Sequence, residues 1–180
     1  MSNLKKFKHE WVWVKNVGSN FANLKYSPMK EHESILVFGN KICYNPQRQP
    51  RVAGSPTKVY TKNIATKSSN VRQGLHKSIT KVMSIDRVPS SVQKFNIERG
   101  FHPTQKPVEM LRYFVRSFSN QNEIVLDNCM GSGSTGVAAL LENRKFIGIE
   151  KDKNYFNIAK QRIKAAKQGI QITKNHIRIE

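Results

Sequence analysis

Hydrophobic residues form two short runs near the N-terminus and a regular series of segments after residue 100. The runs Trp11-Val-Trp-Val14 and Ile35-Leu-Val-Phe38 each predict a β-strand, because aromatic and β-branched residues suit a pleated, half-buried surface. The stretch from Asn16 to Glu33 between them contains the Gly, Asn, Ser and Pro residues of turns. A long antiparallel pair is the simplest arrangement of the two runs.

The segment after residue 100 starts with a helical pattern. Pro107 fits the first position of a helix. Apolar residues then recur at helical spacing, at Val108, Leu111, Val115 and Phe118. Glu123–Asp127 has the composition of a short buried strand, and a second helix is expected through Val137 to Leu141 after a glycine turn.

Lys145–Glu150 predicts a further strand, and Asp152 is suitably placed to cap a third helix. The apolar face expected for that helix consists of Phe156, Ala159, Ile163 and Ala166. A weak final strand pair is expected from Ile170, Ile172, Ile177 and Ile179. The alternation of strand and helix predicts a parallel sheet with crossover helices.

Residues 45–99 have a different texture. Pro46, Pro50 and Pro56 break any long helix, and the rest is polar. The charges are mostly positive, at Arg48, Arg51, Lys58, Lys62, Lys67, Arg72, Lys77, Lys81, Arg87 and Lys94. Such a stretch buries little core. We therefore expect a core made of residues 1–44 and 100–180, with a loop-rich insertion at 45–99 holding one or two short elements.

Charge narrows the class of partner. The chain has 31 Lys and Arg against 12 Asp and Glu, a formal net charge of +19 and a pI near 10.2. This balance favours a polyanion, most simply nucleic acid, with an anionic membrane surface as the alternative. Neither a membrane-spanning run nor a signal peptide is visible, so a cytoplasmic location is expected. Cys43 and Cys129 are predicted to be reduced thiols, and the His spacing predicts no metal site.

The strongest chemical signal is the segment Asp127-Asn-Cys-Met-Gly131-Ser-Gly133-Ser-Thr-Gly136. Glycines at this spacing, between a strand and a helix, allow a sharp turn and a close approach to a ligand. Glu150 ends the next strand, where an acid can accept hydrogen bonds from both hydroxyls of a ribose. The unit predicts a nucleoside-containing cofactor. The alternative is a plain tight turn followed by a solvated acid.

Glycine spacing alone does not separate a dinucleotide from S-adenosylmethionine. Only 30 residues follow Glu150, whereas a dinucleotide fold needs a second half-sheet after the first. The remaining strands are therefore expected from earlier in the sequence, in a permuted order.

The motifs around this turn resemble a known family. His102-Pro-Thr-Gln-Lys-Pro107, followed by a helix, Val125-Leu-Asp127 and Gly131-Ser-Gly133-Ser-Thr135, is similar to the adjoining cofactor motifs of the β-type N6-adenine and N4-cytosine DNA methyltransferases. Phe146–Glu150 resembles the next motif, and Trp13–Phe38 resembles the strand pair before the target-recognition region. The resemblance covers about residues 8–44 and 100–165 and assigns the basic middle to the variable target-recognition region.

The resemblance implies an α/β fold, namely a class I S-adenosylmethionine-dependent methyltransferase (Rossmann-like) sheet that is incomplete here and carries a loop-rich insertion. It also implies a cofactor site for S-adenosyl-L-methionine. The residues implied are Asp127 beside the methionine amino group, Gly131, Ser132 and Gly133 along the methionine, Glu150 at the ribose, and His102, Thr104 and Lys106 on the other side. Lys106 is a candidate partner of the methionine carboxylate, the alternative being an exposed lysine at a helix start.

The catalytic motif of the family, Asp, Asn or Ser followed by Pro-Pro and an aromatic residue, is absent from these residues. No two prolines are adjacent among Pro28, Pro46, Pro50, Pro56, Pro89, Pro103 and Pro107. We therefore expect no catalytic residue in this chain. A second polypeptide carrying the motif, or an inactive remnant, would explain its absence. In the family, strands of that region join the two halves of the sheet, so exposed strand edges and marginal stability or self-association are expected.

The expected activity is methyl transfer from S-adenosylmethionine to specific sites in double-stranded DNA, as in restriction–modification systems. Adenine N6 is the preferred target and cytosine N4 the alternative. An inactive remnant that binds DNA, the cofactor or neither is the second hypothesis, and an unrelated basic nucleic-acid-binding protein is the third. Trp11, Trp13, Tyr155 and Phe156 are expected to pack as core residues rather than to contact a base or the cofactor.

Overall fold

The structure is a computed structural model that describes residues 4–50, 60–64, 77–81 and 86–170. The chain divides into two compact units. The first consists of Met1–Gln47 with Ser90–Glu180, and the second of Arg48–Pro89. No helix in the described part of the chain is long and apolar enough to cross a membrane.

The N-terminal strands form a three-stranded sheet of order β2-β1-β7. β1 (Phe7–Ser19) pairs antiparallel with β2 (Lys30–Phe38), with Trp11 opposite Ile35, which confirms the expected pair. β7 (Val92–Lys94) runs parallel to β1 on its other side. Two 3-10 turns, Leu4–Lys6 and Phe21–Asn23, precede and follow β1. Residues 92–94 therefore belong to the core sheet, although a single valine between polar residues gave no strand signal.

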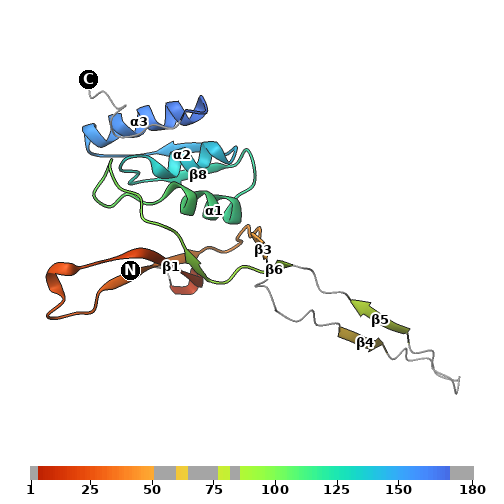
Figure 1. Cartoon of the computed structure of the whole chain (residues 1–180). Helices are drawn as coiled ribbons and strands as arrows, with labels where there is room; N and C mark the ends of the chain where they lie inside the picture. Colours follow the sequence, from red (N-terminus) through yellow and green to blue (C-terminus); the bar gives the residue numbers. More distant parts are fainter. Residues whose placement is uncertain (1–3, 51–59, 65–76, 82–85, 171–180) are drawn as a thin grey trace, which may run out of the picture. The chain divides into compact units, whose positions relative to one another are not determined.

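Three helices follow in the expected order, α1 (Val108–Phe118), α2 (Ser134–Leu141) and α3 (Lys153–Lys167) (Figure 1). Pro107 is the N-cap of α1 rather than its first residue, and its carbonyl accepts the first helical hydrogen bond. Asp152 caps α3 as expected, because its carboxylate accepts from the N–H groups two and three residues further on.

Trp11 and Trp13 are core residues, as the sequence predicted. They are 3% and 2% exposed. Trp11 packs edge-on against Tyr113 and Phe118 of α1, with ring centroids 6.0 and 6.3 Å apart. The indole N–H of Trp13 donates to the carbonyl of Phe95 at 2.8 Å. These contacts bury one face of β1 against α1 and the segment that follows β7.

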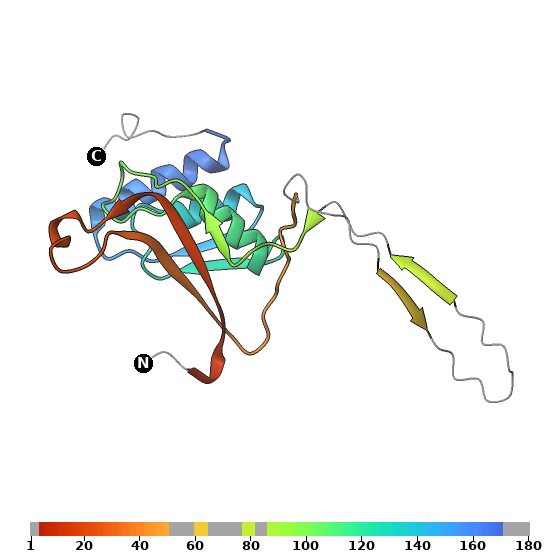
Figure 2. The same cartoon turned by 60° about the horizontal axis from the view of Figure 1, so that its bottom comes forward.

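A second sheet is built from β8 (Ile124–Asp127) and β9 (Lys145–Gly148), which run parallel with α2 crossing between them. This confirms the expected parallel pair with a crossover helix. Among the described residues the two sheets share no strand, as anticipated from the missing motif. Figure 2 shows the helices on one side of β8 and β9.

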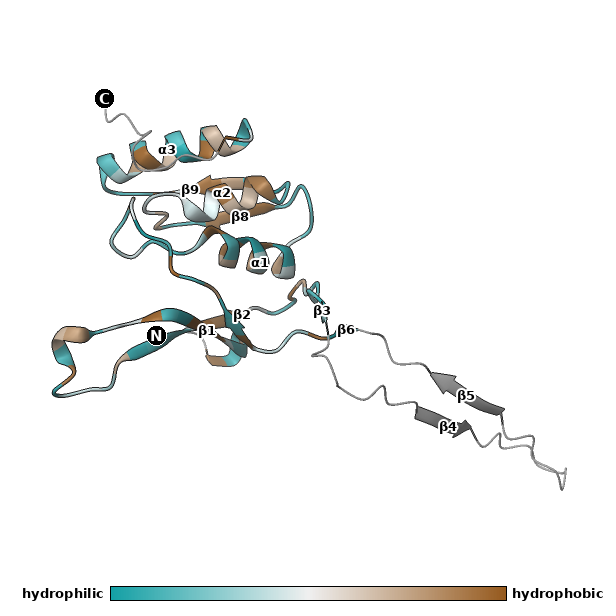
Figure 3. Cartoon of the chain, viewed as in Figure 1, coloured by the Kyte–Doolittle hydropathy of each residue, from teal (hydrophilic) through white to brown (hydrophobic). Residues whose placement is uncertain are grey.

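The expectation that Glu123–Asp127 is a buried strand is wrong, because three of its five residues are exposed and the other two are only partly buried. Ile124 and Leu126 are 60% and 61% exposed, and Ile147 and Ile149 are also exposed. Leu126 lies beside Ile147 in the register, so these four side chains share one face. The other face packs on α2, where Phe146 contacts the position of Gly136. Figure 3 shows the hydrophobic colouring of β8 and β9. We call Ile124, Leu126, Ile147 and Ile149 the open face.

The buried face of α3 also differs from the expected one. Ala159, Arg162 and Ala165 are buried, whereas Phe156, assigned to the core, is 40% exposed. The helix lies so close to the glycine turn that Ala159 would be 2.8 Å from a Cβ on Gly133. Only a small residue fits that contact.

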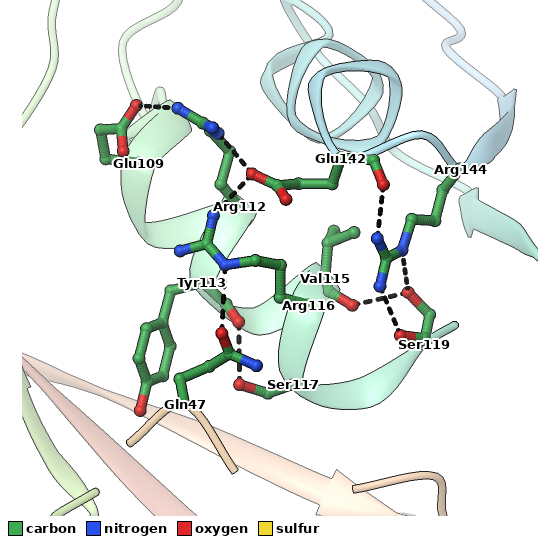
Figure 4. A network of polar contacts seen from close by, with 10 residues as sticks. All are labelled: Gln47, Glu109, Arg112, Tyr113, Val115, Arg116, Ser117, Ser119, Glu142 and Arg144. Carbon is green, nitrogen blue, oxygen red and sulfur yellow. Dashed lines mark hydrogen bonds and ion pairs between the residues drawn. The ribbon is translucent and has the colours of Figure 1, made fainter. Parts of the chain in front are cut away.

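A polar network joins the C-terminal ends of α1 and α2 (Figure 4). The carboxylate of Glu142 accepts from Arg112 at 2.7 Å and from Arg116 at 2.6 Å. The buried guanidinium of Arg144 donates to the carbonyl of Ser119 at 2.6 Å and to the carbonyl of Glu142. These bonds give hydrogen-bond donors to carbonyls at the ends of α1 and α2, and the Ser119 carbonyl also accepts from the side-chain amide of Asn45 at 3.2 Å.

The second unit contains two short antiparallel pairs. β3 (Gln49–Pro50) pairs with β6 (Asp86–Arg87), and β4 (Tyr60–Ile64) pairs with β5 (Lys77–Lys81). Arg48 donates two hydrogen bonds to the Asp86 carboxylate, at 2.6 and 2.8 Å, so this cation has a protein partner. Outside the described residues lie the basic residues Arg51, Lys58, Lys67 and Arg72, and Ile172, Ile177 and Ile179 of the expected final strands.

Candidate functional site

The glycine turn between β8 and α2 has the backbone conformation that its sequence predicted. Gly131 and Gly133 have φ angles of +51° and +78°, which side chains rarely adopt. The N–H of Gly133 donates to the carbonyl of Met130 at 2.8 Å and closes the turn. A Cβ on Gly133 would lie 2.8 Å from that of Ala159, so glycine also permits the contact with α3.

Glu150 lies next to this turn, although it is 19 residues away in sequence. One carboxylate oxygen accepts from the N–H of Gly131 at 2.8 Å, and the other accepts from the N–H of Asp152 at 2.9 Å. The N–H of Asp152, and then that of Gly131, hold the pKa of Glu150 below its usual range. The carboxylate is therefore ionised at neutral pH and acts only as an acceptor, with lone pairs left for a ligand.

Asp127 is the last residue of β8 and lies beside Gly148 of β9 in the register. Its carboxylate accepts from the N–H of Cys129 at 3.1 Å, which fixes the start of the turn. The carboxyl ends of the two parallel strands thus carry Asp127 and Glu150, one on each side of the glycine turn. This is the edge at which open α/β sheets bind ligands.

The loop before α1 supplies the opposite wall. The ring of His102 lies 3.4 Å from where a Cβ of Gly131 would be, so a side chain there would fill the space between them. Thr104 contacts Nδ1 of His102 through its N–H and its hydroxyl, at 3.2 and 3.1 Å. Tyr155, assigned to the core from sequence, is half-buried and meets the His102 ring edge-on at 4.3 Å. Tyr155 is therefore a candidate wall residue that periodicity alone did not identify.

Lys106 takes a different partner from the one expected. Its ammonium contacts the carboxylate of Glu33 at 2.8 Å, and Lys15 contacts the other oxygen of Glu33 at 2.7 Å. Both ammonium groups lie over the Trp13 ring, at 5.8 and 5.4 Å from its centroid. Partial burial alone would raise the pKa of Glu33, but the hydrogen bonds from Lys106 and Lys15 outweigh it and lower that pKa. A contact between Lys106 and a cofactor carboxylate stays a prediction.

Ser132 is buried in the middle of the turn and accepts hydrogen bonds from Arg162, a residue that the sequence analysis did not identify. Its carbonyl and its hydroxyl accept from Nη1 of Arg162, at 2.7 and 3.0 Å. The same nitrogen donates to the hydroxyl of Ser134 at 3.2 Å. Burial lowers the pKa of the Arg162 guanidinium, and Glu98 partly opposes this shift. The sequence holds one sign of this role, because Arg162 occurs between alanines on the buried face of α3.

Arg162 also lines a cavity of about 560 Å³. Its walls come from α1, α2, α3 and the loop before α1, and include Phe101, Val108, Val137 and Leu141. Asp127, Gly131 and Glu150 are not among its lining residues. This cavity is therefore separate from the edge of the sheet that carries the candidate site.

A family model described as DNA methylase, for the N6 and N4 type, matches residues 2–161, which is most of the chain. The chain belongs to the N6/N4 DNA methylase family. The resemblance inferred from the motifs at His102–Pro107, Gly131–Gly133 and Glu150 is thereby confirmed.

Individual methylases match different lengths of the chain. The type II methyltransferase M.HpaI of Haemophilus parainfluenzae is 31% identical over 168 residues, 88% of this chain and 45% of M.HpaI. The orphan methyltransferase M.BamHII of Bacillus amyloliquefaciens is 37% identical over 107 residues, 58% of this chain and 40% of M.BamHII. The chain thus spans less than half the length of these relatives.

Solved structures agree on the fold. The M1.HpyAVI–SAM complex has a TM-score of 0.52 and 28% identity, covering 87% of this chain and 61% of that one. The cytosine-N4-specific PvuII DNA methyltransferase has a TM-score of 0.53 at 14% identity, over 95% of this chain and 61% of that one. This chain therefore has the class I methyltransferase α/β fold, with incomplete sheets in its described part.

Proposed function

We propose that this methylase binds S-adenosylmethionine at the carboxyl edge of β8 and β9 and belongs to a system that methylates double-stranded DNA. The target is an exocyclic amine at specific sites, adenine N6 in preference to cytosine N4, as in type II restriction–modification. The observation that carries the proposal is the hydrogen bond from the N–H of Gly131 to Glu150, which joins the glycine turn to the acid.

The residues at this edge fit an adenosyl ligand. Glu150 is ionised and can accept from the two ribose hydroxyls. Asp127 offers a carboxylate to an amino group, and the turn at Gly131 lets the backbone approach the ligand closely. His102 and Tyr155 present ring surfaces on the other wall. When bound, S-adenosylmethionine supplies the electrophilic methyl group, and these residues bind and orient it.

Methyl transfer also needs acceptors for the target amine and an aromatic platform for the flipped base. The Pro-Pro-aromatic motif that performs these roles in the family is not among the 180 residues. We propose that a further polypeptide segment supplies it, either a second polypeptide or a part of the same polypeptide outside these residues. The open face supports this proposal, because Ile124, Leu126, Ile147 and Ile149 leave an apolar surface that water solvates poorly.

DNA binding is supported by the net charge of +19. Lysine and arginine contacts with phosphates release condensed counterions, so affinity should fall linearly with the logarithm of salt concentration. We propose the second unit, Arg48–Pro89, as the target-recognition region within the basic stretch 45–99, with its cations acting as a patch. Arg48 contributes less to this patch, because the Asp86 carboxylate is its ion-pair partner in the described part of the second unit. A DNA affinity independent of salt would contradict this electrostatic account.

The deciding experiment separates cofactor binding from catalysis. Calorimetry first measures binding of S-adenosylmethionine to this chain and to its Glu150→Ala variant, which should bind at least about tenfold more weakly, because hydrogen bonds to a charged acceptor contribute about 1.5–3 kcal/mol. Transfer of labelled methyl groups to unmethylated duplex DNA is then measured with the chain alone and with a polypeptide carrying the Pro-Pro-aromatic motif. Nucleoside analysis of the product distinguishes N6-methyladenine from N4-methylcytosine.

Methylation only in the mixture would support the proposed division of roles. Cofactor binding without methylation in either sample would favour the second candidate, a catalytically inactive module that holds DNA or cofactor. The missing adjacent prolines are the observation behind this second candidate. Methylation by the chain alone would contradict the requirement for the motif, and failure to bind S-adenosylmethionine would refute the proposed site.

A further inference from the structure

Arg162 contacts both segments that border the candidate site, the glycine turn and the loop before α1. Its Nη1 binds the carbonyl and hydroxyl of Ser132, between the two turn glycines of positive φ. Its guanidinium also stacks on the ring of Phe101, with Cζ 4.4 Å from the ring centroid. Phe101 immediately precedes His102, whose ring faces Gly131. One side chain of α3 therefore connects the glycine turn with the loop that faces it.

A packing role alone does not account for a charged residue at this position. Arg162 is 6% exposed, and its hydrogen bonds among the described residues go to neutral oxygens of Ser132 and Ser134. Ser134 begins α2, so the cation also lies at the end of a helix dipole that repels positive charge. An apolar residue of similar volume would avoid both costs.

The guanidinium supplies what an apolar residue lacks. A planar fork can donate to the turn while its face stacks on an aromatic ring. The bonds to Ser132 hold the carbonyl between Gly131 and Gly133, and the stack holds Phe101 against the same group. Without the guanidinium, the glycine turn would lose its hydrogen bonds at Ser132, and Phe101 would lose its stacking partner.

We propose that Arg162 is a positioning residue for the cofactor site, holding the glycine turn and the loop that carries His102 in their places beside Glu150, where the adenosyl ligand binds. This inference rests on the proposed function and deepens it. Arg162 acts through Ser132 and Phe101 and is assigned no contact with the ligand.

The test compares Arg162→Met and Arg162→Lys with Arg144→Met in the full chain. Arg144 is a matched control, because it is 7% exposed and also donates to backbone carbonyls, but between α1 and α2. Affinity for S-adenosylhomocysteine is measured by calorimetry at a temperature where circular dichroism shows every variant folded. We expect about tenfold weaker binding for Arg162→Met and unchanged binding for Arg144→Met, as for residues that orient a ligand shell. Arg162→Lys should recover only part of the loss, because an ammonium lacks the fork and the planar stack.

A second readout reports on geometry without ligand. The His102 ring proton resonances in NMR spectra, assigned with His102→Asn, should shift in Arg162→Met, because the Tyr155 ring lies 4.3 Å away and its ring current depends on their separation. Phe101→Leu keeps the bonds to Ser132 but removes the stack, and should shift the same resonances if Arg162 variants do not fold.

The outcomes separate the two proposals. Loss of affinity confined to the Arg162 and Phe101 variants, with shifted His102 resonances, supports the positioning role. Unchanged affinity in Arg162→Met, or an equal loss in Arg144→Met, overturns it while leaving the proposed function intact. A wild-type chain that binds neither S-adenosylmethionine nor S-adenosylhomocysteine refutes the proposed function, and this inference with it.

Discussion

Replacing Gly133 by alanine should destabilise the fold through two separable effects. Gly133 has φ +78°, and an L-residue in this left-handed region costs about 1–2 kcal/mol. The new Cβ would also lie 2.8 Å from the Cβ and 3.0 Å from the Cα of Ala159, and 3.2 Å from Ile163. Overpacking of this kind costs about 1–3 kcal/mol. The expected loss for Gly133→Ala is therefore about 2–5 kcal/mol.

Gly169 provides the matched control. It follows α3 with φ +74°, almost the same as Gly133, but among the described residues, its chain neighbours aside, no heavy atom lies within 4 Å of the point that a Cβ on it would occupy. Gly169→Ala should therefore show only the conformational cost of about 1–2 kcal/mol. Urea unfolding followed by circular dichroism measures both variants. A difference of about 2 kcal/mol between them displaces the midpoints by about 1 M, given usual slopes for small domains.

The comparison is decisive because the two glycines differ chiefly in their surroundings. Equal unfolding free energies for the two variants would show that α3 moves away from the turn at negligible cost. The close contact between Gly133 and Ala159 would then not fix α3, and the geometry that places Arg162 behind the turn would lose its main support.

Three further expectations concern ion pairs and the open face. Glu142→Gln should lower the free energy of unfolding in urea by about 1–3 kcal/mol, because it leaves Arg112 and Arg116 without their carboxylate partner. The control is Glu109→Gln, which should lower it by less than about 0.5 kcal/mol, because the side chain of Glu109 is 70% exposed. Equal losses in the two variants would contradict the role of burial. Because the pKa of Glu33 is lowered, its ion pairs stabilise the fold fully above its ordinary pKa of 4.5, and this stabilisation is lost as the pH falls through the folded-state pKa. The free energy of unfolding should therefore fall less steeply below about pH 4.5 in Glu33→Gln than in the wild type. Parallel pH curves for the two proteins would contradict this role of Glu33. Leu126 is 61% exposed on the open face. Leu126→Asp should therefore reduce self-association measured by sedimentation and reduce the binding of a hydrophobic dye, with the helical circular dichroism signal unchanged. Unchanged self-association would show that the open face does not cause it.

Local patterns predicted the elements of the first unit well, and failed where tertiary contacts decide. The runs at Trp11 and Ile35, the helix after Pro107 and the cap at Asp152 were all correct, because each depends on neighbouring residues. β7 was missed, because Val92 is the only apolar residue of that strand and only its pairing with β1 makes it one.

Burial proved harder to predict than secondary structure. Ile124 and Leu126 have the composition of a core strand, but their exposure depends on which elements cover the sheet. Phe156 was assigned to the core by helical periodicity, yet it is 40% exposed, and it is Ala159 that makes the close contact with Gly133. The spacing of apolar residues along a helix does not record such a steric requirement.

Site prediction from sequence was strongest where a motif fixes the backbone. The turn at Gly131 and the acid Glu150 at the end of the next strand were both identified from the sequence, and the structure brings the two together. The partner of Lys106 could not be inferred, because Glu33 lies 73 residues away on another strand. Arg162 escaped notice for the same reason, since its role depends on Ser132 and Phe101 meeting behind the turn.

The anchoring of the chain on both sides of residues 48–89 has a consequence for how such a protein can diversify. Before this stretch, Asn45 is held by hydrogen bonds to the backbone at the end of α1, including its N–H to the carbonyl of Ser117 at 2.8 Å. After it, the carbonyl of Ser91 accepts from the N–H of Val12 at 2.8 Å. Because the closure entropy of a loop grows only by about 0.6 kcal/mol for each doubling of its length, residues between two such clamps can be lengthened, shortened or exchanged at little thermodynamic cost to the core. The proposed target-recognition unit can therefore change from one relative to another while the proposed cofactor site stays the same.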